Sequence, residues 1–191
     1  MKAYNTLPDG YKEIYKLDMQ KDKKLSFWLN FAASFVAVIM MVVPYFFADS
    51  PFEMPFWTWC MILGLMVVYT ILHELVHGIT MKAVGTKKVK YGFTGLYAFA
   101  GSNDYYDKTA YITIALAPVI VWGIVLAVIQ CFTPVAWFWV PWLVQVTNIS
   151  GAAGDAYVTA KFSKMPKDIL VSDYGVGMTV YSKEEWPAAK Q

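Results

Sequence analysis

The sequence predicts an all-α membrane protein with four transmembrane helices, and three observations favour this fold class. Hydrophobic residues make up 58% of the 191 residues, charged residues make up 16%, and the mean hydropathy is +0.42. Soluble domains carry about 25% charged residues. The chain also contains four long apolar stretches, and its lysines lie on one side of them. We expect a single domain over residues 1–191, with a short cytoplasmic strand or hairpin near 89–99.

Each of the four apolar stretches reaches the length of about 20 residues that a helix needs to cross a bilayer. In the first, the polar interruptions are Ser26, Asn30 and Ser34. The second contains both histidines of the chain. The third contains Pro118, which should kink its helix and free backbone carbonyls. The fourth carries small residues around an aspartate. The predicted spans are about 25–47, 56–82, 110–132 and 135–162.

The lysines predict the orientation of these spans. All 16 basic residues are lysine: six precede the first span, five lie between Lys82 and Lys108, and five lie from Lys161 onward. The positive-inside rule then places both termini and the 83–109 loop in the cytoplasm. Tryptophans lie at the ends of the second and fourth spans that are away from the lysines, as expected at the outer membrane interface, and they agree with this orientation. The lack of arginine, which favours phosphate clamps and guanine contacts, argues against nucleic-acid binding.

The cytoplasmic loop contains a segment with the period of a β-strand. From Val89 to Phe99, apolar or aromatic residues and one glycine occupy every second position, so they lie on one side of an extended chain. Gly95 could bend the segment into a hairpin. Such a strand could pair with an extended substrate beside a protease site. It could equally lie as a plain amphipathic strand on the membrane surface.

The second span carries the sequence His-Glu-Leu-Val-His, which is the HExxH motif of zinc metalloproteases. His73 and His77 are four residues apart, so both imidazoles lie on one face of a helix and can bind one metal ion. Glu74 is rotated by about 100° from His73, beside the metal, where it can deprotonate a water molecule. Ionisable residues inside a membrane span are costly and usually functional. The motif predicts one zinc ion per chain.

A catalytic zinc needs a third protein ligand, and no histidine remains to supply it. We expect Asp155, because its depth in the fourth span matches that of His73 in the second span. The small residues on both sides of Asp155 would let the two helices approach closely. Asp104 and Asp107, in the loop after the motif helix, are the alternatives.

Asn148 lies seven residues before Asp155 and therefore on the same helix face. Its buried amide could act in catalysis by stabilising the developing oxyanion of the substrate. An interhelical hydrogen bond that steadies the helix pair is an equally good interpretation.

Four segments resemble a family of small bacterial integral membrane proteins, the zincin peptidases of the HExxH type. They are LPDGYKEI near the start, ILHELVHGI in the second span, Gly-Asp at 154–155, and MPKDILVSDYGVGMTVY in the tail. The resemblance implies an integral membrane zinc peptidase, similar in concept to the site-2 intramembrane metalloproteases. It implies zinc binding by His73 and His77 and a catalytic role for Glu74, and it extends to Asp155 as a ligand.

These observations predict a zinc metallopeptidase embedded in the bacterial cytoplasmic membrane. It would hydrolyse peptide bonds of transmembrane or membrane-associated protein or peptide substrates near the cytoplasmic interface, with Glu74 as general base and then acid. The expected partners are that substrate and the lipid bilayer, not nucleic acid. The alternative is a non-catalytic zinc-binding regulatory membrane protein, which would hold the metal without Glu74-dependent turnover.

Overall fold

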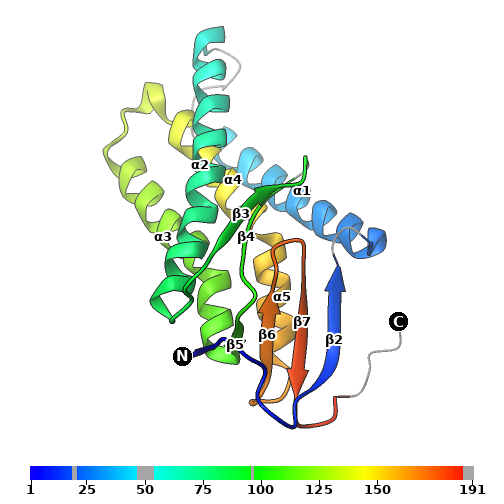
Figure 1. Cartoon of the computed structure of the whole chain (residues 1–191). Helices are drawn as coiled ribbons and strands as arrows, with labels where there is room; N and C mark the ends of the chain where they lie inside the picture. Colours follow the sequence, from blue (N-terminus) through cyan, green and yellow to red (C-terminus); the bar gives the residue numbers. More distant parts are fainter. Residues whose placement is uncertain (19–20, 47–53, 96, 187–191) are drawn as a thin grey trace.

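The computed structural model describes residues 1–18, 21–46, 54–95 and 97–186, and it combines α-helices with two antiparallel sheets (Figure 1). The prediction of an all-α protein is therefore wrong, and the fold is mixed α/β. Residue 47, the last of the first predicted span, lies outside the described residues. The long helices extend from one end of the molecule, and the larger sheet lies at the other end.

Three helices are long and apolar enough to cross a membrane. They are α1 (Lys23–Tyr45), α2 (Phe56–Ala83) and α3 (Lys108–Phe132). Asp22 caps α1 by accepting a hydrogen bond from the Leu25 amide at 2.9 Å, and Asp107 caps α3 by accepting one from Ala110 at 2.8 Å. Aspartate at these two positions explains why both helices begin where the apolar runs begin.

The fourth predicted span, 135–162, is not one continuous helix. A short 3₁₀ turn (Val135–Trp137) leads into α4 (Trp139–Gly151), and α5 (Ala153–Ser163) follows after a break at Ala152. Ala152 has a ψ angle of 13°, outside the α-helical range. Gly151 and Gly154 flank the break, and glycine costs about 1 kcal/mol relative to alanine inside a helix. The small residues that suggested close helix packing therefore accompany a break in the helix.

The larger sheet has five antiparallel strands in the order β1-β5-β6-β7-β2. Its strands are β1 (Ala3–Tyr4), β2 (Lys12–Asp18), β5 (Tyr105–Asp107), β6 (Leu170–Asp173) and β7 (Gly177–Ser182). They come from the N-terminus, the loop before α3 and the C-terminal tail. The sheet thus gathers the polar segments outside the apolar stretches into one layer.

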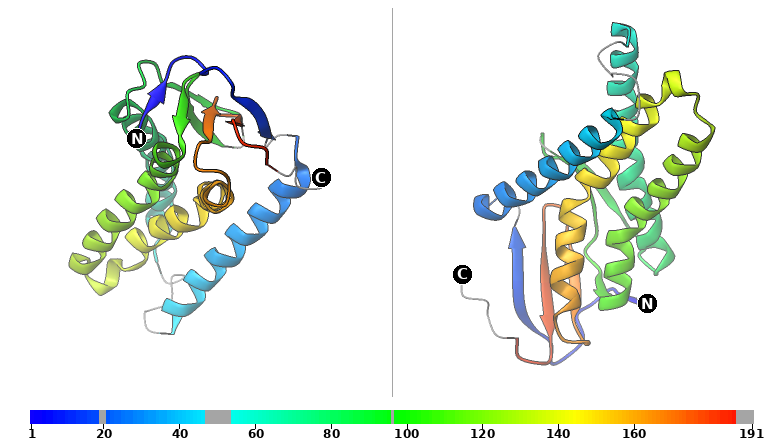
Figure 2. Two further views of the ribbon diagram at one scale, coloured as in Figure 1. Left: turned by 90° about the horizontal axis from the view of Figure 1, so that it is seen from below. Right: turned by 180° about the vertical axis from the view of Figure 1, so that it is seen from behind.

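One face of this sheet packs against α5 and the first half of α3, as Figure 2 shows from behind. Tyr106, Val171 and Val180 are fully buried there, and they form one core with Tyr111 of α3 and Phe162 of α5. This core anchors the first turns of α3 and the C-terminal half of α5 to the sheet. It therefore fixes the position of α5, on which Asp155 lies.

A second sheet of two strands, β3 (Lys90–Phe93) and β4 (Ala98–Gly101), lies against α2. The hairpin turns at Gly95, whose φ of +90° favours glycine. Tyr91 packs over Gly78 of α2 so closely that a Cβ atom at position 78 would overlap the tyrosine hydroxyl. Gly78 therefore allows the hairpin to lie directly on the helix that carries the HExxH motif.

This contact predicts opposite effects for two glycines of α2. Gly78→Ala should destabilise the protein by about 1 kcal/mol, the low end of overpacking costs, because the added methyl group displaces the half-exposed Tyr91 ring from the helix. Gly64→Ala is the matched control, since a Cβ at position 64 meets nothing within 4 Å. Thermal unfolding in detergent should show a lower Tm for the first variant and an unchanged or higher Tm for the second. Equal Tm values for the two variants would contradict this packing.

Candidate metal centre

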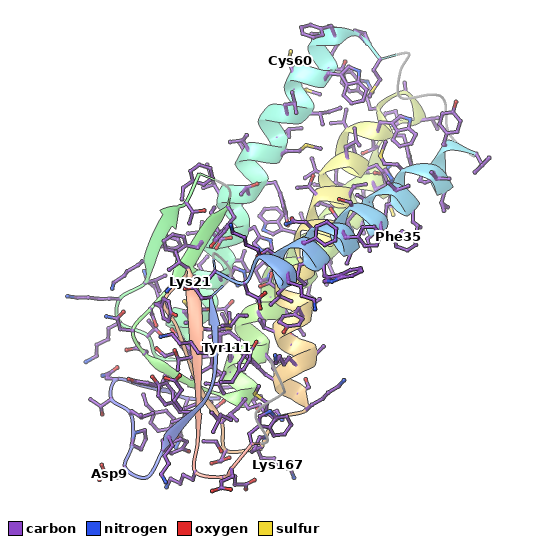
Figure 3. All side chains as sticks on the ribbon, turned by 90° about the vertical axis from the view of Figure 1, so that its right-hand side faces the viewer. Asp9, Lys21, Phe35, Cys60, Tyr111 and Lys167 are labelled. Atoms are coloured by element: carbon purple, nitrogen blue, oxygen red, sulfur yellow. The ribbon has the colours of Figure 1, made fainter. Side chains whose placement is uncertain are left out.

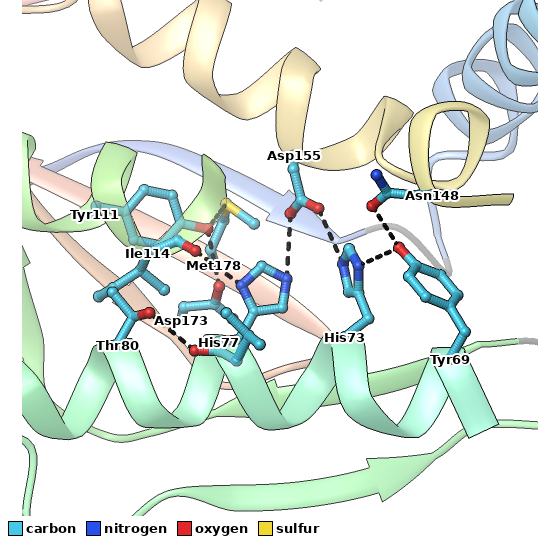
Figure 4. A network of polar contacts seen from close by, with 11 residues as sticks. Tyr69, His73, His77, Thr80, Tyr111, Ile114, Asn148, Asp155, Asp173 and Met178 are labelled. Carbon is cyan, nitrogen blue, oxygen red and sulfur yellow. Dashed lines mark hydrogen bonds and ion pairs between the residues drawn. The ribbon is translucent and has the colours of Figure 1, made fainter. Parts of the chain in front are cut away.

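Helix α2 directs His73 and His77 toward Asp155 on the first turn of α5 (Figure 4). The Nε2 atom of His73 lies 3.5 Å from Oδ2 of Asp155, and Nε2 of His77 lies 3.7 Å from Oδ1. One ligand atom from each of the three residues lies within 4.8 Å of the others. Two imidazole nitrogens and one carboxylate are a donor set that zinc uses in proteins. These three residues could therefore hold a metal ion and leave one coordination position open.

Helix α3 brings the two halves of this group together. It packs against both α2 and α5, whereas α5 packs on α3 and α1. Pro118 of α3 has no N–H group, so the carbonyl of Ile114, four residues earlier, has no helical donor. The Ile114 oxygen instead lies 2.9 Å from Nδ1 of His77. Because a carbonyl only accepts, Nδ1 carries the hydrogen, which leaves Nε2, on the side of Asp155, as the nitrogen that can bind a metal ion.

Tyr69 plays the corresponding part for His73. The Tyr69 hydroxyl lies 2.8 Å from Nδ1 of His73 and donates to Oδ1 of Asn148, also at 2.8 Å. The hydroxyl has one hydrogen, which goes to Asn148, so His73 donates from Nδ1 to the tyrosine oxygen. In His73, as in His77, Nε2 is therefore the nitrogen left for a metal ion. Both histidines have the Nδ1 hydrogen bond that metal binding at Nε2 requires.

Asn148 is completely buried between helices. Its amide nitrogen donates to the Val119 carbonyl at 3.2 Å and to the Gln145 side chain at 3.3 Å, while its oxygen accepts from Tyr69. These contacts favour the interpretation of Asn148 as an interhelical hydrogen-bonding residue behind His73. Its role in stabilising an oxyanion stays a prediction.

The three possible ligands border a cavity of about 1030 Å³. Their side chains are 11–23% exposed, so they are mostly shielded and still reach the open space. Glu74 lines the same cavity, as does Ala100 of β4. Gly151 and Gly154 also border the cavity, and a Cβ on either would meet nothing within 4 Å. Small residues here keep space open beside Asp155 instead of allowing helices to touch.

The structure places the two alternative ligands elsewhere. Asp107 caps α3 and lies 3.7 Å from the N-terminal amino group. Asp104 lies between β4 and β5, where its backbone amide donates to Ser102 Oγ. In the part of the chain that the structure describes, the group of possible metal ligands contains neither of them.

Sequence reasoning did not identify Tyr69, Ile114 or the strand residue Ala100 as parts of this site. Tyr69 lies one helical turn before His73, and that spacing was a usable signal. Ile114 lies one turn before Pro118, so a free carbonyl at this position was also predictable from the sequence. The residue that donates a hydrogen bond to this carbonyl was not. The position of Ala100 depends on the fold of the hairpin against α2, which no local pattern indicates.

The hydrogen bond from His73 predicts a specific effect of removing the tyrosine hydroxyl. Tyr69→Phe should weaken zinc binding by about 10- to 100-fold, because His73 loses the partner that sets its tautomer and ring orientation. Competition with a chelator of known affinity would measure the change. Tyr45→Phe, an exposed position on α1, should leave zinc affinity unchanged. Equal zinc affinity in wild type and Tyr69→Phe would contradict the proposed orientation of His73.

Comparison with known proteins supports the interpretation of this site. Residues 65–170, which include the HExxH motif and Asp155, match the family described as "Putative zincin peptidase". The chain is also 34% identical over 129 residues to an uncharacterized 24.7 kDa protein of Pyrococcus woesei. That alignment covers 64% of this chain and 54% of the relative, so the chain spans about half the length of that protein. No solved structure matches the chain.

The family match covers more than half of the chain and includes all three residues of the candidate metal centre together with Glu74. The chain therefore belongs to this zincin peptidase family.

Proposed function

We propose that this protein is a membrane-embedded zinc metallopeptidase that cleaves membrane protein or peptide substrates near the cytoplasmic interface. The convergence of His73, His77 and Asp155 on one point, with Glu74 in the same cavity, carries this proposal. Tetrahedral zinc with bonds of about 2.0–2.2 Å places its ligand atoms about 3.3–3.6 Å apart. The distances of 3.5 and 3.7 Å from the two histidines to the two carboxylate oxygens of Asp155 are close to this spacing.

The chemistry follows from these residues. A bound zinc ion would supply a Lewis acid that acidifies water and polarises the scissile carbonyl. Glu74 takes the proton of the water molecule as its oxygen attacks the carbonyl carbon. As the C–N bond breaks, Glu74 returns that proton to the leaving nitrogen, so the products are a carboxylic acid and an amine, and transfer of the acid's proton to the amine gives a carboxylate and an ammonium group. The two hydrogen-bonded imidazoles and Asp155 keep their positions throughout.

The edge of β4 offers a place for the substrate backbone. The Thr94 amide donates to the Tyr97 carbonyl at 3.0 Å, and Phe99 pairs with Gly92. Because antiparallel pairs alternate, the backbone groups of Ala98 and Ala100 point away from β3. Ala98 and Ala100 both line the cavity beside Glu74. An extended peptide that pairs with this edge would pass the metal centre with its peptide bonds exposed.

Three features support insertion in a membrane. The helices α1, α2 and α3 are long and apolar enough to cross it. Large apolar side chains, Phe35 among them, are exposed along these helices (Figure 3). Charged residues such as Asp9 and Lys167 lie at the opposite end, around the larger sheet. In our proposal α4 and α5 together form the fourth crossing, and the sheet and both termini lie in the cytoplasm.

Replacement of the general base tests the catalytic proposal. Glu74→Gln should lower peptide hydrolysis by roughly 10³-fold, because the amide cannot accept the proton of water. Zinc content should stay at the wild-type value, since Glu74 is not a ligand. The measurement is cleavage of a panel of single-span peptides in detergent, with zinc quantified in the same samples.

Glu184→Gln makes the same side-chain change in the C-terminal tail and is the control. This variant should cleave the peptides at the wild-type rate. Equal cleavage by Glu74→Gln and wild type would contradict the mechanism. Zinc binding without cleavage by the wild type would favour the non-catalytic zinc-binding alternative.

Cysteine labelling tests the orientation in the membrane. In a chain with Cys60 and Cys131 replaced by serine, Ala136→Cys should react with an impermeant maleimide in intact cells. Position 136 is exposed in the turn between α3 and α4. Lys167→Cys is exposed near the larger sheet and should react only after the membrane is permeabilised. The reverse labelling pattern would contradict the proposed topology.

A further inference from the structure

The turn between β6 and β7 lies against the strand that borders the metal centre. This turn, residues 174–176, follows Asp173 and precedes Gly177. A Cβ on Gly175 would overlap the ring of Phe99 in β4, and φ at Gly175 is +92°. A Cβ on Gly101 would lie 2.5 Å from the Gly175 nitrogen and 2.6 Å from the Tyr174 carbonyl carbon. The turn and β4 are therefore in direct contact at two glycines.

Backbone hydrogen bonds extend this contact. The Ser102 amide, directly after β4, donates to the Asp173 carbonyl at 2.7 Å. Within the turn, the Tyr174 amide donates to the Gly177 carbonyl at 3.1 Å, and the Gly175 amide donates to Oδ1 of Asp173 at 2.9 Å. Because the larger sheet fixes β6 and β7 on both sides, the turn is a rigid support for β4.

Helix α3 ties this support to the metal centre. Tyr111 donates a hydrogen bond of 2.8 Å to Oδ2 of Asp173, and Ile114, three residues later, accepts from His77. Burial raises the pKa of the Asp173 carboxyl above its ordinary value, while the hydrogen bonds from Gly175 and Tyr111 lower it. One turn of α3 thus contacts both Asp173, directly before the β6–β7 turn, and the candidate metal ligand His77.

We propose that the β6–β7 turn is a positioning element that holds the edge of β4 at the metal centre for pairing with an extended substrate. This inference rests on the proposed function. None of the turn's residues is a candidate metal ligand, and the turn lies after the residues 65–170 that match the family. Gly175 also borders the cavity, and in this proposal the turn acts on substrate binding, through the position of β4, and not on metal binding.

Gly175→Ala tests this role, because the added methyl group pushes Phe99 and β4 away from their places. For a single-span peptide that the wild type cleaves, KM should rise about tenfold with kcat and zinc content nearly unchanged, as expected for lost substrate binding. Gly10→Ala is the matched control. Gly10 has a similar φ of +86°, but its nearest neighbour for a Cβ is Lys183, at 3.8 Å. An unchanged KM in Gly175→Ala, or a loss of zinc, would overturn the proposal.

Amide hydrogen exchange provides a readout that needs no activity. Exchange in the peptide 97–102 should become faster in Gly175→Ala than in wild type and Gly10→Ala, with the α2 peptide around the HExxH motif unchanged. Unchanged exchange at 97–102 would overturn the proposal even if the wild type cleaves no peptide. Absence of cleavage by the wild type would instead count against the proposed function.

A milder variant covers the case in which Gly175→Ala does not fold. Tyr111→Phe removes only the hydroxyl, which bonds Asp173 at 2.8 Å and lies 3.3 Å from the sulfur of Met178. It should raise KM and speed exchange at 97–102 in the same direction, by smaller factors. Wild-type values of both quantities in this variant would overturn the link through α3.

Discussion

The packing of α3 against both α2 and α5 is the constraint on which the candidate metal centre depends. The histidines lie on α2 and the aspartate lies on α5, and α3 is the helix that packs along both. Pro118 turns this scaffold into part of the site, because it leaves the Ile114 carbonyl free to accept from His77. A proline that weakens one helix thereby orients a ligand on another.

The polar groups around the metal centre are stable in an apolar helical region because they have partners. An unpaired buried hydrogen-bonding group costs about 1–3 kcal/mol. Tyr69 and Asn148 avoid this cost by bonding each other, and Asn148 also bonds the Val119 carbonyl of α3 and the Gln145 side chain of its own helix. The same bonds hold His73 in one orientation. Formation of this network therefore links correct helix packing to a metal centre that is prepared before the ion binds.

Local patterns in the sequence were sufficient for the helices α1 to α3 and for the group of His73, His77 and Asp155. Apolar length indicates a helix directly, and the i, i+4 spacing of two histidines needs no knowledge of the rest of the fold. The five-stranded sheet could not be predicted in this way. Its strand β1 has two residues, and β5 pairs with segments about 65 to 100 residues away. Such pairings depend on which segments α3 and α5 bring together, and the break at Ala152 likewise became visible only in three dimensions.

The zinc content of detergent-purified protein, measured by mass spectrometry, shows whether His73, His77 and Asp155 hold one metal ion together. The comparison includes wild type, His77→Ala, Asp155→Ala and, as a control for aspartate loss, Asp104→Ala. A three-residue site predicts about one zinc ion per chain in wild type and Asp104→Ala, as for a three-ligand catalytic site, and little zinc in the other two variants. Zinc retained at the wild-type level in a folded Asp155→Ala protein would contradict it.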